Sequence, residues 1–157
     1  MVKKTEEGHT RRAFCVQAAS LAVFTGGLAP LLQSCSSPSS PDNVTSLPVV
    51  IGTRSSAGIT LIVDANSPLA AVGSAALLQT SSGNFLVAHT AQSTFSALSS
   101  ICTHEVCTIN GWSSQSFVCP CHGSTFDTSG HVARGPAPSS LRQYPAQFVD
   151  GVLTITA

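Results

Sequence analysis

Residues 102–107 read Cys-Thr-His-Glu-Val-Cys and residues 119–124 read Cys-Pro-Cys-His-Gly-Ser, and these two segments carry four of the chain's six cysteines and two of its five histidines. Each segment pairs a cysteine with a histidine at a spacing that lets one loop present both side chains. Fourteen residues separate His104 from Cys119, which is enough for a hairpin that brings the two loops side by side. The pattern predicts two loops that clasp one metal centre.

Each segment also contains a second cysteine, Cys107 in the first and Cys121 in the second. Two thiolates and two imidazoles alone would equally describe a structural zinc site. If the protein is exported, the additional thiols can oxidise, and a disulfide between them would join the two loops around the cofactor. Structural zinc sites do not usually need such a bond, so the second pair favours an iron–sulfur centre over zinc.

The N-terminal part of the chain has the features of a targeting segment. Residues 10–14, Thr-Arg-Arg-Ala-Phe, resemble the twin-arginine export signal and directly precede the apolar residues 13–32. Twin-arginine export carries folded proteins, which suits a domain that receives iron and sulfide in the cytoplasm. We therefore interpret residues 1–35 as a twin-arginine-like leader or membrane anchor, and we expect the domain to be membrane-attached and to face the periplasm or the outside.

The end of the apolar stretch is compatible with three kinds of processing or attachment of the N-terminal segment. Residues 32–35, Leu-Gln-Ser-Cys, resemble a lipoprotein processing site, which makes Cys35 a lipidation candidate, although Gln33 departs from the usual residue there. The stretch would span about 30 Å as a helix, so an uncleaved anchor is an alternative, and simple secretion is the third. Residues 36–46 are rich in serine and proline and are interpreted as a flexible linker.

The chain is nearly uncharged, with charged residues making up 9% of its sequence. From residue 36 on, the charged residues are Arg54, Arg134, Arg142, Asp42, Asp64, Glu105, Asp127 and Asp150. No basic stripe exists that could bind phosphate backbones, so nucleic acid is excluded as a partner. The length of 157 residues allows one small globular domain, which we place at residues 47–157.

This domain is predicted to be all-β. Short apolar runs alternate with turn residues at 47–51, 59–63, 75–79, 85–88 and 95–98. No stretch combines helical periodicity with helix caps. Asp150-Gly151, between residues 143–149 and 152–156, predicts a terminal hairpin. We therefore expect an antiparallel β sandwich.

The two cysteine–histidine segments resemble the ligand boxes of Rieske iron–sulfur proteins, of the disulfide-bearing kind found in cytochrome bc and b6f complexes. The resemblance runs from Gly73 to the terminal hairpin and includes residues 135–138, Gly-Pro-Ala-Pro, which in the family form a loop over the cluster. It implies a Rieske-type antiparallel β sandwich with a cluster-binding subdomain of two ligand loops and a proline loop. It also implies one [2Fe-2S] cluster as the cofactor.

The resemblance implies the metal ligands residue by residue. It makes Cys102 and Cys119 ligands of the buried iron, and His104 and His122 ligands of the outer iron. Two ferric ions, two sulfides and two thiolates sum to zero charge, which raises the reduction potential relative to plant-type ferredoxins. No residue receives a catalytic role, because the chain is expected to be an electron-transfer subunit of an oxidoreductase rather than an enzyme alone.

Other positions near the ligands match the family or depart from it. Cys107 and Cys121 match the family disulfide. Ser124 matches a serine whose hydroxyl bonds a bridging sulfide and is counted among the cofactor-binding residues. Phe126 stands where high-potential members carry a tyrosine, and residues 105–106, Glu-Val, replace the Leu-Gly of respiratory proteins. The Phe126 departure predicts a potential below that of quinol-oxidising relatives.

Two functions follow from the resemblance. The first is one-electron transfer as the iron–sulfur subunit of a quinol-oxidising cytochrome bc-like complex, with a cytochrome b-type membrane subunit and a cytochrome c as partners. The alternative, favoured by Glu105 and Phe126, is a self-standing exported electron carrier or a small subunit of a periplasmic oxidoreductase without quinone contact. We expect no Rieske oxygenase, because the chain has no room for a mononuclear iron site.

Overall fold

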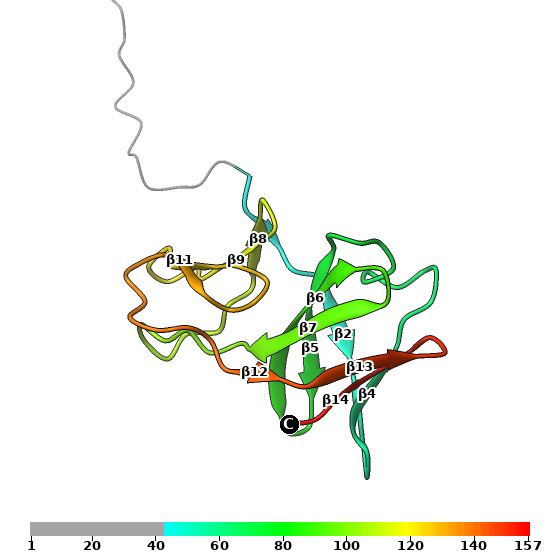
Figure 1. Cartoon of the computed structure of the whole chain (residues 1–157). Helices are drawn as coiled ribbons and strands as arrows, with labels where there is room; N and C mark the ends of the chain where they lie inside the picture. The colour runs from blue at the N-terminus through cyan, green and yellow to red at the C-terminus, as the bar shows by residue number, and fades with distance from the viewer. Residues whose placement is uncertain (1–42) are drawn as a thin grey trace, which may run out of the picture. The chain divides into compact units, whose positions relative to one another are not determined.

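The structure is a computed structural model that describes residues 43–157. All fourteen elements within this range are β-strands, and they form three sheets (Figure 1). Within the described range, no helix is long and apolar enough to cross a membrane. The twin-arginine-like leader, the lipidation candidate Cys35 and residues 36–42 of the expected linker lie outside the described residues. The all-β prediction is confirmed.

The first sheet contains, in spatial order, β1 (Thr45–Ser46), β8 (Gly111–Ser113), β9 (Ser116–Val118), β10 (Thr125–Phe126) and β11 (Val132–Arg134). The central sheet contains β12 (Gln143–Tyr144), β7 (Thr94–Ser99), β6 (Gly83–Ala91), β5 (Ala75–Thr80) and β2 (Val49–Ile51). The third sheet contains β13 (Ala146–Val149), β14 (Val152–Ile155), β4 (Gly58–Ile62) and β3 (Thr53–Ser55).

The central sheet is buried on both faces and separates two hydrophobic cores. Successive side chains of a strand point to opposite faces, so Leu77 and its partner Leu86 pack into one core while Leu78 and its partner Phe85 pack into the other. The first core lies between the central sheet and the first sheet, and the second core lies between the central and third sheets. Burial of each such large apolar side chain stabilises the fold by about 1.5–3 kcal/mol.

The terminal hairpin is the best-predicted local feature. Residues 149 and 152 pair across the turn, and Asp150 and Gly151 have φ values of +50° and +79°. Both values lie in the left-handed region that a two-residue type I′ turn requires. Within the long run expected at residues 143–149, Pro145 separates β12 from β13, because proline has no N–H to donate to a neighbouring strand.

The pairing of β2 differs from the expected antiparallel pattern. Residues 49–51 run parallel to residues 77–79 of β5, whereas the other strand pairs are antiparallel. The backbone N–H of Leu77 donates to Pro48 O over 2.9 Å, and that of Gly52 donates to Gln79 O over 2.9 Å. A proline at residue 48 and a glycine at residue 52 bound this strand, so it is short and lies at the edge of the central sheet.

The described chain begins on the first sheet. Thr45 and Ser46 pair with Trp112 and Gly111 of β8. The N–H of Leu47 continues this pairing by donating to a backbone oxygen at residue 110 over 2.7 Å, and its side chain is buried in the first core. The polypeptide therefore enters the domain through the subdomain that carries the cysteine–histidine segments, and only then reaches the central sheet.

Candidate metal centre

The first ligand loop, residues 102–107, follows β7 and is closed at its base by backbone hydrogen bonds. The N–H of Cys102 donates to Cys107 O over 2.9 Å, and the N–H of Ile109 donates to Ser100 O over 2.8 Å. These bonds fix Cys102 at the base of a narrow hairpin. Cys102 is only 4% exposed there. Residues 103–106 form the tip of this loop.

The second ligand loop, residues 119–124, connects β9 to β10 in the same manner. The N–H of Cys119 donates to Ser124 O over 2.8 Å, which repeats the five-residue spacing of the first loop, and the N–H of Gly123 donates to Cys119 O over 3.0 Å. Gly123 has a φ of +73°, a conformation that glycine adopts without steric cost. Each loop therefore holds its first cysteine at the base and its histidine nearer the tip.

A disulfide joins the two loops. Cys107 and Cys121 are bonded, with their Cα atoms 6.6 Å apart and a sequence separation of 14. The disulfide expected from the sequence is therefore confirmed. The β8–β9 hairpin between the loops, also expected, places them side by side and makes this bond geometrically accessible.

A hydrogen bond connects the proline loop, residues 135–138, to the second ligand loop. Ser139, just after the proline loop, is hydrogen-bonded to the first ligand loop. Thr103 Oγ1 donates to Ser139 O over 2.6 Å. The backbone N–H of Ala137 donates to Ser124 Oγ over 3.0 Å, and Ser124 is fully buried. Because the Ser124 oxygen already accepts this bond, its own hydroxyl proton is left to donate elsewhere in the site. Neither tie has a signal in the local sequence.

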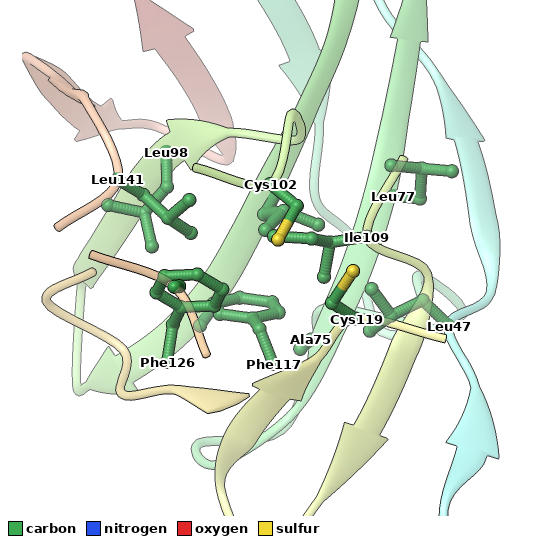
Figure 2. Packing of buried hydrophobic residues seen from close by; sticks show 13 residues of the cluster. Leu47, Ala75, Leu77, Leu98, Cys102, Ile109, Phe117, Cys119, Phe126 and Leu141 are labelled. Atoms are coloured by element: carbon green, nitrogen blue, oxygen red, sulfur yellow. The ribbon is translucent and has the colours of Figure 1, made fainter. Parts of the chain in front are cut away.

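The four candidate ligands divide into a buried half and an open half. Cys102 and Cys119 are 4% and 1% exposed, and both belong to the first core. In Figure 2 their sulfur atoms lie in the core that also holds the Phe117 and Phe126 rings. The His104 and His122 rings meet edge to face with centroids 4.7 Å apart, and the His122 side chain is 45% exposed.

The surroundings of Cys119 favour a bound metal over a free thiolate. Burial raises the pKa of the Cys119 thiol, and the neighbouring Cys102 thiol raises it further, while backbone N–H groups of Cys121 and His122 act in the opposite direction. A bound metal would replace the proton, and the same two N–H groups would then donate to a ligated sulfur. The buried Nδ1 of His104 has no hydrogen-bond partner, and such an orphaned nitrogen is available to bind a metal. The donor set of two thiols and two imidazoles therefore fits a mixed-ligand cluster.

An acidic side chain lies against the open half. Glu105 Oε2 is 3.9 Å from His122 Nδ1, and both side chains are partly exposed. Next to Glu105, Val106 is 94% exposed at the tip of the first loop. The sequence placed Glu105 beside His104, but its approach to the histidine of the other loop depends on how the two loops face each other.

The remaining described histidines lie outside this centre. His89 is buried in β6, where its Nδ1 is 2.9 Å from Leu69 O. His131 is exposed, and its Nδ1 is 3.3 Å from Asp127 Oδ2. Neither residue joins the four candidate ligands.

The sequence and the fold both match known proteins. Residues 62–145 match the profile of the Rieske [2Fe-2S] domain. The cytochrome b6-f complex iron-sulfur subunit of Trichodesmium erythraeum (strain IMS101) is 48% identical over 61 residues, covering 38% of this chain and 34% of that subunit. The subunit of the same description from Prochlorococcus marinus (strain AS9601) is 56% identical over 46 residues, covering 28% of this chain and 25% of that subunit.

These curated relatives are matched over about a third of their length or less. Among solved structures, the plasma membrane Rieske protein PetC3 from Synechocystis PCC 6803 is 34% identical, with a TM-score of 0.48, and the match covers 53% of this chain and 86% of that one. A naphthalene 1,2-dioxygenase chain gives a TM-score of 0.52 at 17% identity, covering 64% of this chain and 26% of that one, which is a likeness of fold alone. With the domain profile matching more than half of its residues, the chain belongs to the Rieske [2Fe-2S] family and takes one [2Fe-2S] cluster as its cofactor.

Proposed function

We propose that Cys102, His104, Cys119 and His122 hold this cluster, the cysteines on the buried iron and the histidines on the outer iron. When bound, the cluster supplies one-electron redox chemistry. The observation that carries the proposal is the division of the donor set into two buried thiols and two paired imidazoles, of which that of His122 is partly exposed. Cys102 and Cys119 exclude water from one side of the centre, and the histidines provide the side at which a redox partner can dock.

The chain functions, in this proposal, as the iron–sulfur subunit of a quinol-oxidising cytochrome bc-like complex, taking an electron from quinol and passing it to a cytochrome c. The two curated relatives described above are named cytochrome b6-f complex iron-sulfur subunit, which supports a cytochrome-containing complex as partner. The free hydroxyl proton of Ser124 supports it further, because donation to a cluster sulfide would raise the potential. Export by the twin-arginine-type route and membrane attachment through Cys35 complete the proposal. The mass of the mature N-terminal peptide tests the attachment at Cys35, and accumulation of the precursor in cells that lack the twin-arginine translocase tests the route.

The alternative is a self-standing exported carrier, or a small subunit of a periplasmic oxidoreductase, without quinone contact. The specific observation that favours it is the carboxylate of Glu105 close to His122. A quinol that approached this imidazole would meet a negative charge at the same place. Val106, which is 94% exposed, adds a branched apolar side chain at this tip.

One purification separates the two functions. The full chain, tagged at its C-terminus, is isolated from the source organism's membranes in mild detergent, and the haem that co-purifies is measured by its difference spectrum. The bc-like assignment predicts b-type haem in a fixed ratio to the iron–sulfur signal, and quinol-dependent reduction of cytochrome c by the isolated complex. Protein that retains its iron–sulfur EPR signal but carries no b-type haem would overturn the first function in favour of the second.

We expect Glu105→Gln to raise the reduction potential by about 10–30 mV at low ionic strength, because removal of a negative charge near the cluster makes electron uptake easier. The Glu105 side chain is 64% exposed, so added salt should shrink the difference. Redox titration followed by EPR measures both quantities. Asp127→Asn is the matched control, because Asp127 lies beside His131 rather than His122. Equal shifts in the two variants would contradict a local effect of Glu105.

We also expect Phe126→Tyr to raise the potential, by tens of millivolts. One additional hydrogen bond of about 1 kcal/mol to a ligand sulfur corresponds to about 40 mV for one electron. Phe126 is fully buried in the core that contains both cysteine sulfurs. Phe117→Tyr adds the same hydroxyl to another fully buried ring of this core and is the matched control. A Phe126 variant that folds, binds its cluster and titrates at the wild-type potential would contradict this effect of a hydroxyl at residue 126.

A further inference from the structure

Three sulfur atoms lie close together at the second ligand loop, and one of them belongs to the candidate ligand Cys119. Sγ of Cys119 lies within 4.8 Å of the sulfurs of both Cys107 and Cys121, and these two are already bonded to each other. Cys102 and Cys119 are the free cysteines of the described residues, and both are buried. One free thiol is therefore held against a disulfide that it can attack without a large movement of the chain.

We propose that Cys119 is the nucleophile of an intramolecular thiol–disulfide exchange that operates only when the cluster is absent. The inference rests on the proposed ligand set, because cluster binding through Cys119 would occupy its sulfur and prevent the attack. Loss of the cluster frees that sulfur beside the disulfide. The exchange then converts a site able to rebind the cofactor into one that has lost a ligand.

The reaction balances without any oxidant. Sγ of Cys119 gives up its proton and forms a bond to Sγ of Cys107, while the Cys107–Cys121 bond breaks and its electron pair leaves on Sγ of Cys121, which takes up one proton, so the exchange changes no net protonation. One disulfide and one thiol are consumed, and one of each is formed. Attack on Cys121 instead would close a ring across a single intervening residue, which restrains the approach of the two Cβ atoms.

The difference in burial between Cys119 and Cys121 favours the product, in which Cys121 is the free thiol. Cys119 is 1% exposed, so the attacking thiol is shielded from solvent before the reaction. Cys121, the leaving residue, is exposed, so its sulfur emerges into water, where a thiolate is well hydrated. The product differs from the native chain in a way that a water-soluble alkylating reagent detects, because a reactive thiol replaces a protected one.

The experiment follows Cys121 directly. The full chain, with Cys15→Ser and Cys35→Ser to remove thiols outside the domain, is stripped of its cluster by an iron chelator under argon and incubated at constant pH without added thiol or oxidant. Samples are alkylated in the native state with N-ethylmaleimide, reduced, alkylated with a second reagent and analysed by tandem mass spectrometry. We expect native-state labelling of Cys121 to rise from a few per cent to more than half, at a rate independent of protein concentration, and labelling of Cys119 to stay low.

Two variants identify the nucleophile. Cys102→Ser also removes a proposed ligand but keeps Cys119, so it should exchange like stripped wild-type protein, whereas Cys119→Ser should keep Cys121 protected. Trp112 fluorescence verifies that each variant is folded. Unlabelled Cys121 in stripped, folded wild-type protein would overturn the exchange, and equal labelling in the Cys119 variant would assign it to another thiol. Cluster binding by Cys102→Ser would instead overturn the proposed ligand set, so the two failures are distinguishable.

Discussion

Replacement of Cys119 by serine is expected to abolish cluster binding, leaving a purified protein that is colourless and has no iron–sulfur EPR signal after reduction. Cys119 is 1% exposed at the base of the second loop, and no other described free cysteine except Cys102 lies in this core. A serine hydroxyl at this depth ionises far less readily than a thiol, so it cannot supply the negative charge that the iron requires. Iron and sulfide analysis with visible absorbance measures the loss, which should exceed a factor of ten.

The matched control, made in the unprocessed full-length chain, is Cys15→Ser, which also removes one thiol but lies in the leader. It should retain full iron content and an unchanged EPR spectrum. The Cys119 variant should still fold, because the disulfide and both cores remain, and urea denaturation followed by Trp112 fluorescence verifies this. A folded Cys119→Ser protein with wild-type iron and sulfide content would show that the cluster is held by other residues.

Gly58→Ala is expected to have the largest effect on stability, lowering the free energy of unfolding by about 3–5 kcal/mol. Gly58 begins β4 with a φ of +127°, a backbone conformation that L-residues rarely adopt. A Cβ at this position would also lie 2.4 Å from the backbone oxygen of Ile155 in β14. Both the strain and the clash must be relieved by a shift between paired strands of the third sheet.

Gly83→Ala separates the cost of backbone strain from the cost of the steric clash. Gly83 has a φ of +131°, but a Cβ there would meet nothing within 4 Å, so we expect a loss of about 1–3 kcal/mol from backbone strain alone. Urea denaturation measures both variants, and the chain's single tryptophan, Trp112, reports the transition. Equal losses in the two variants would mean that the contact with Ile155 does not contribute.

The sequence predicted the parts of the fold that are encoded locally. Residues 59–63, 75–79, 85–88 and 95–98 correspond to strands β4 to β7 because each is a short apolar run between turn residues, although β6 extends beyond its run at both ends. The terminal hairpin followed from Asp150-Gly151, whose conformations a two-residue turn requires. The disulfide was also predicted, since the two cysteine–histidine segments each carry a second cysteine.

Other features depend on which distant segments meet, and the local sequence carries no sign of them. The hydroxyl of Thr103 bonds a carbonyl oxygen 36 residues away. β3, at residues 53–55, has exposed side chains and exists because it pairs with β4 rather than because of its own pattern. The contact of Glu105 with His122 likewise joins two loops whose relative orientation is set by the disulfide and the β8–β9 hairpin.

The entry of the chain through β1 has a mechanical consequence. Tension applied from the N-terminal side would load the two β1–β8 residue pairs and the Leu47 anchor before it reached the central sheet. β8 leads through β9 into the loop that contains Cys119 and His122. Any force that restrains or pulls the domain from that end is therefore borne first by the part of the protein that carries the redox centre.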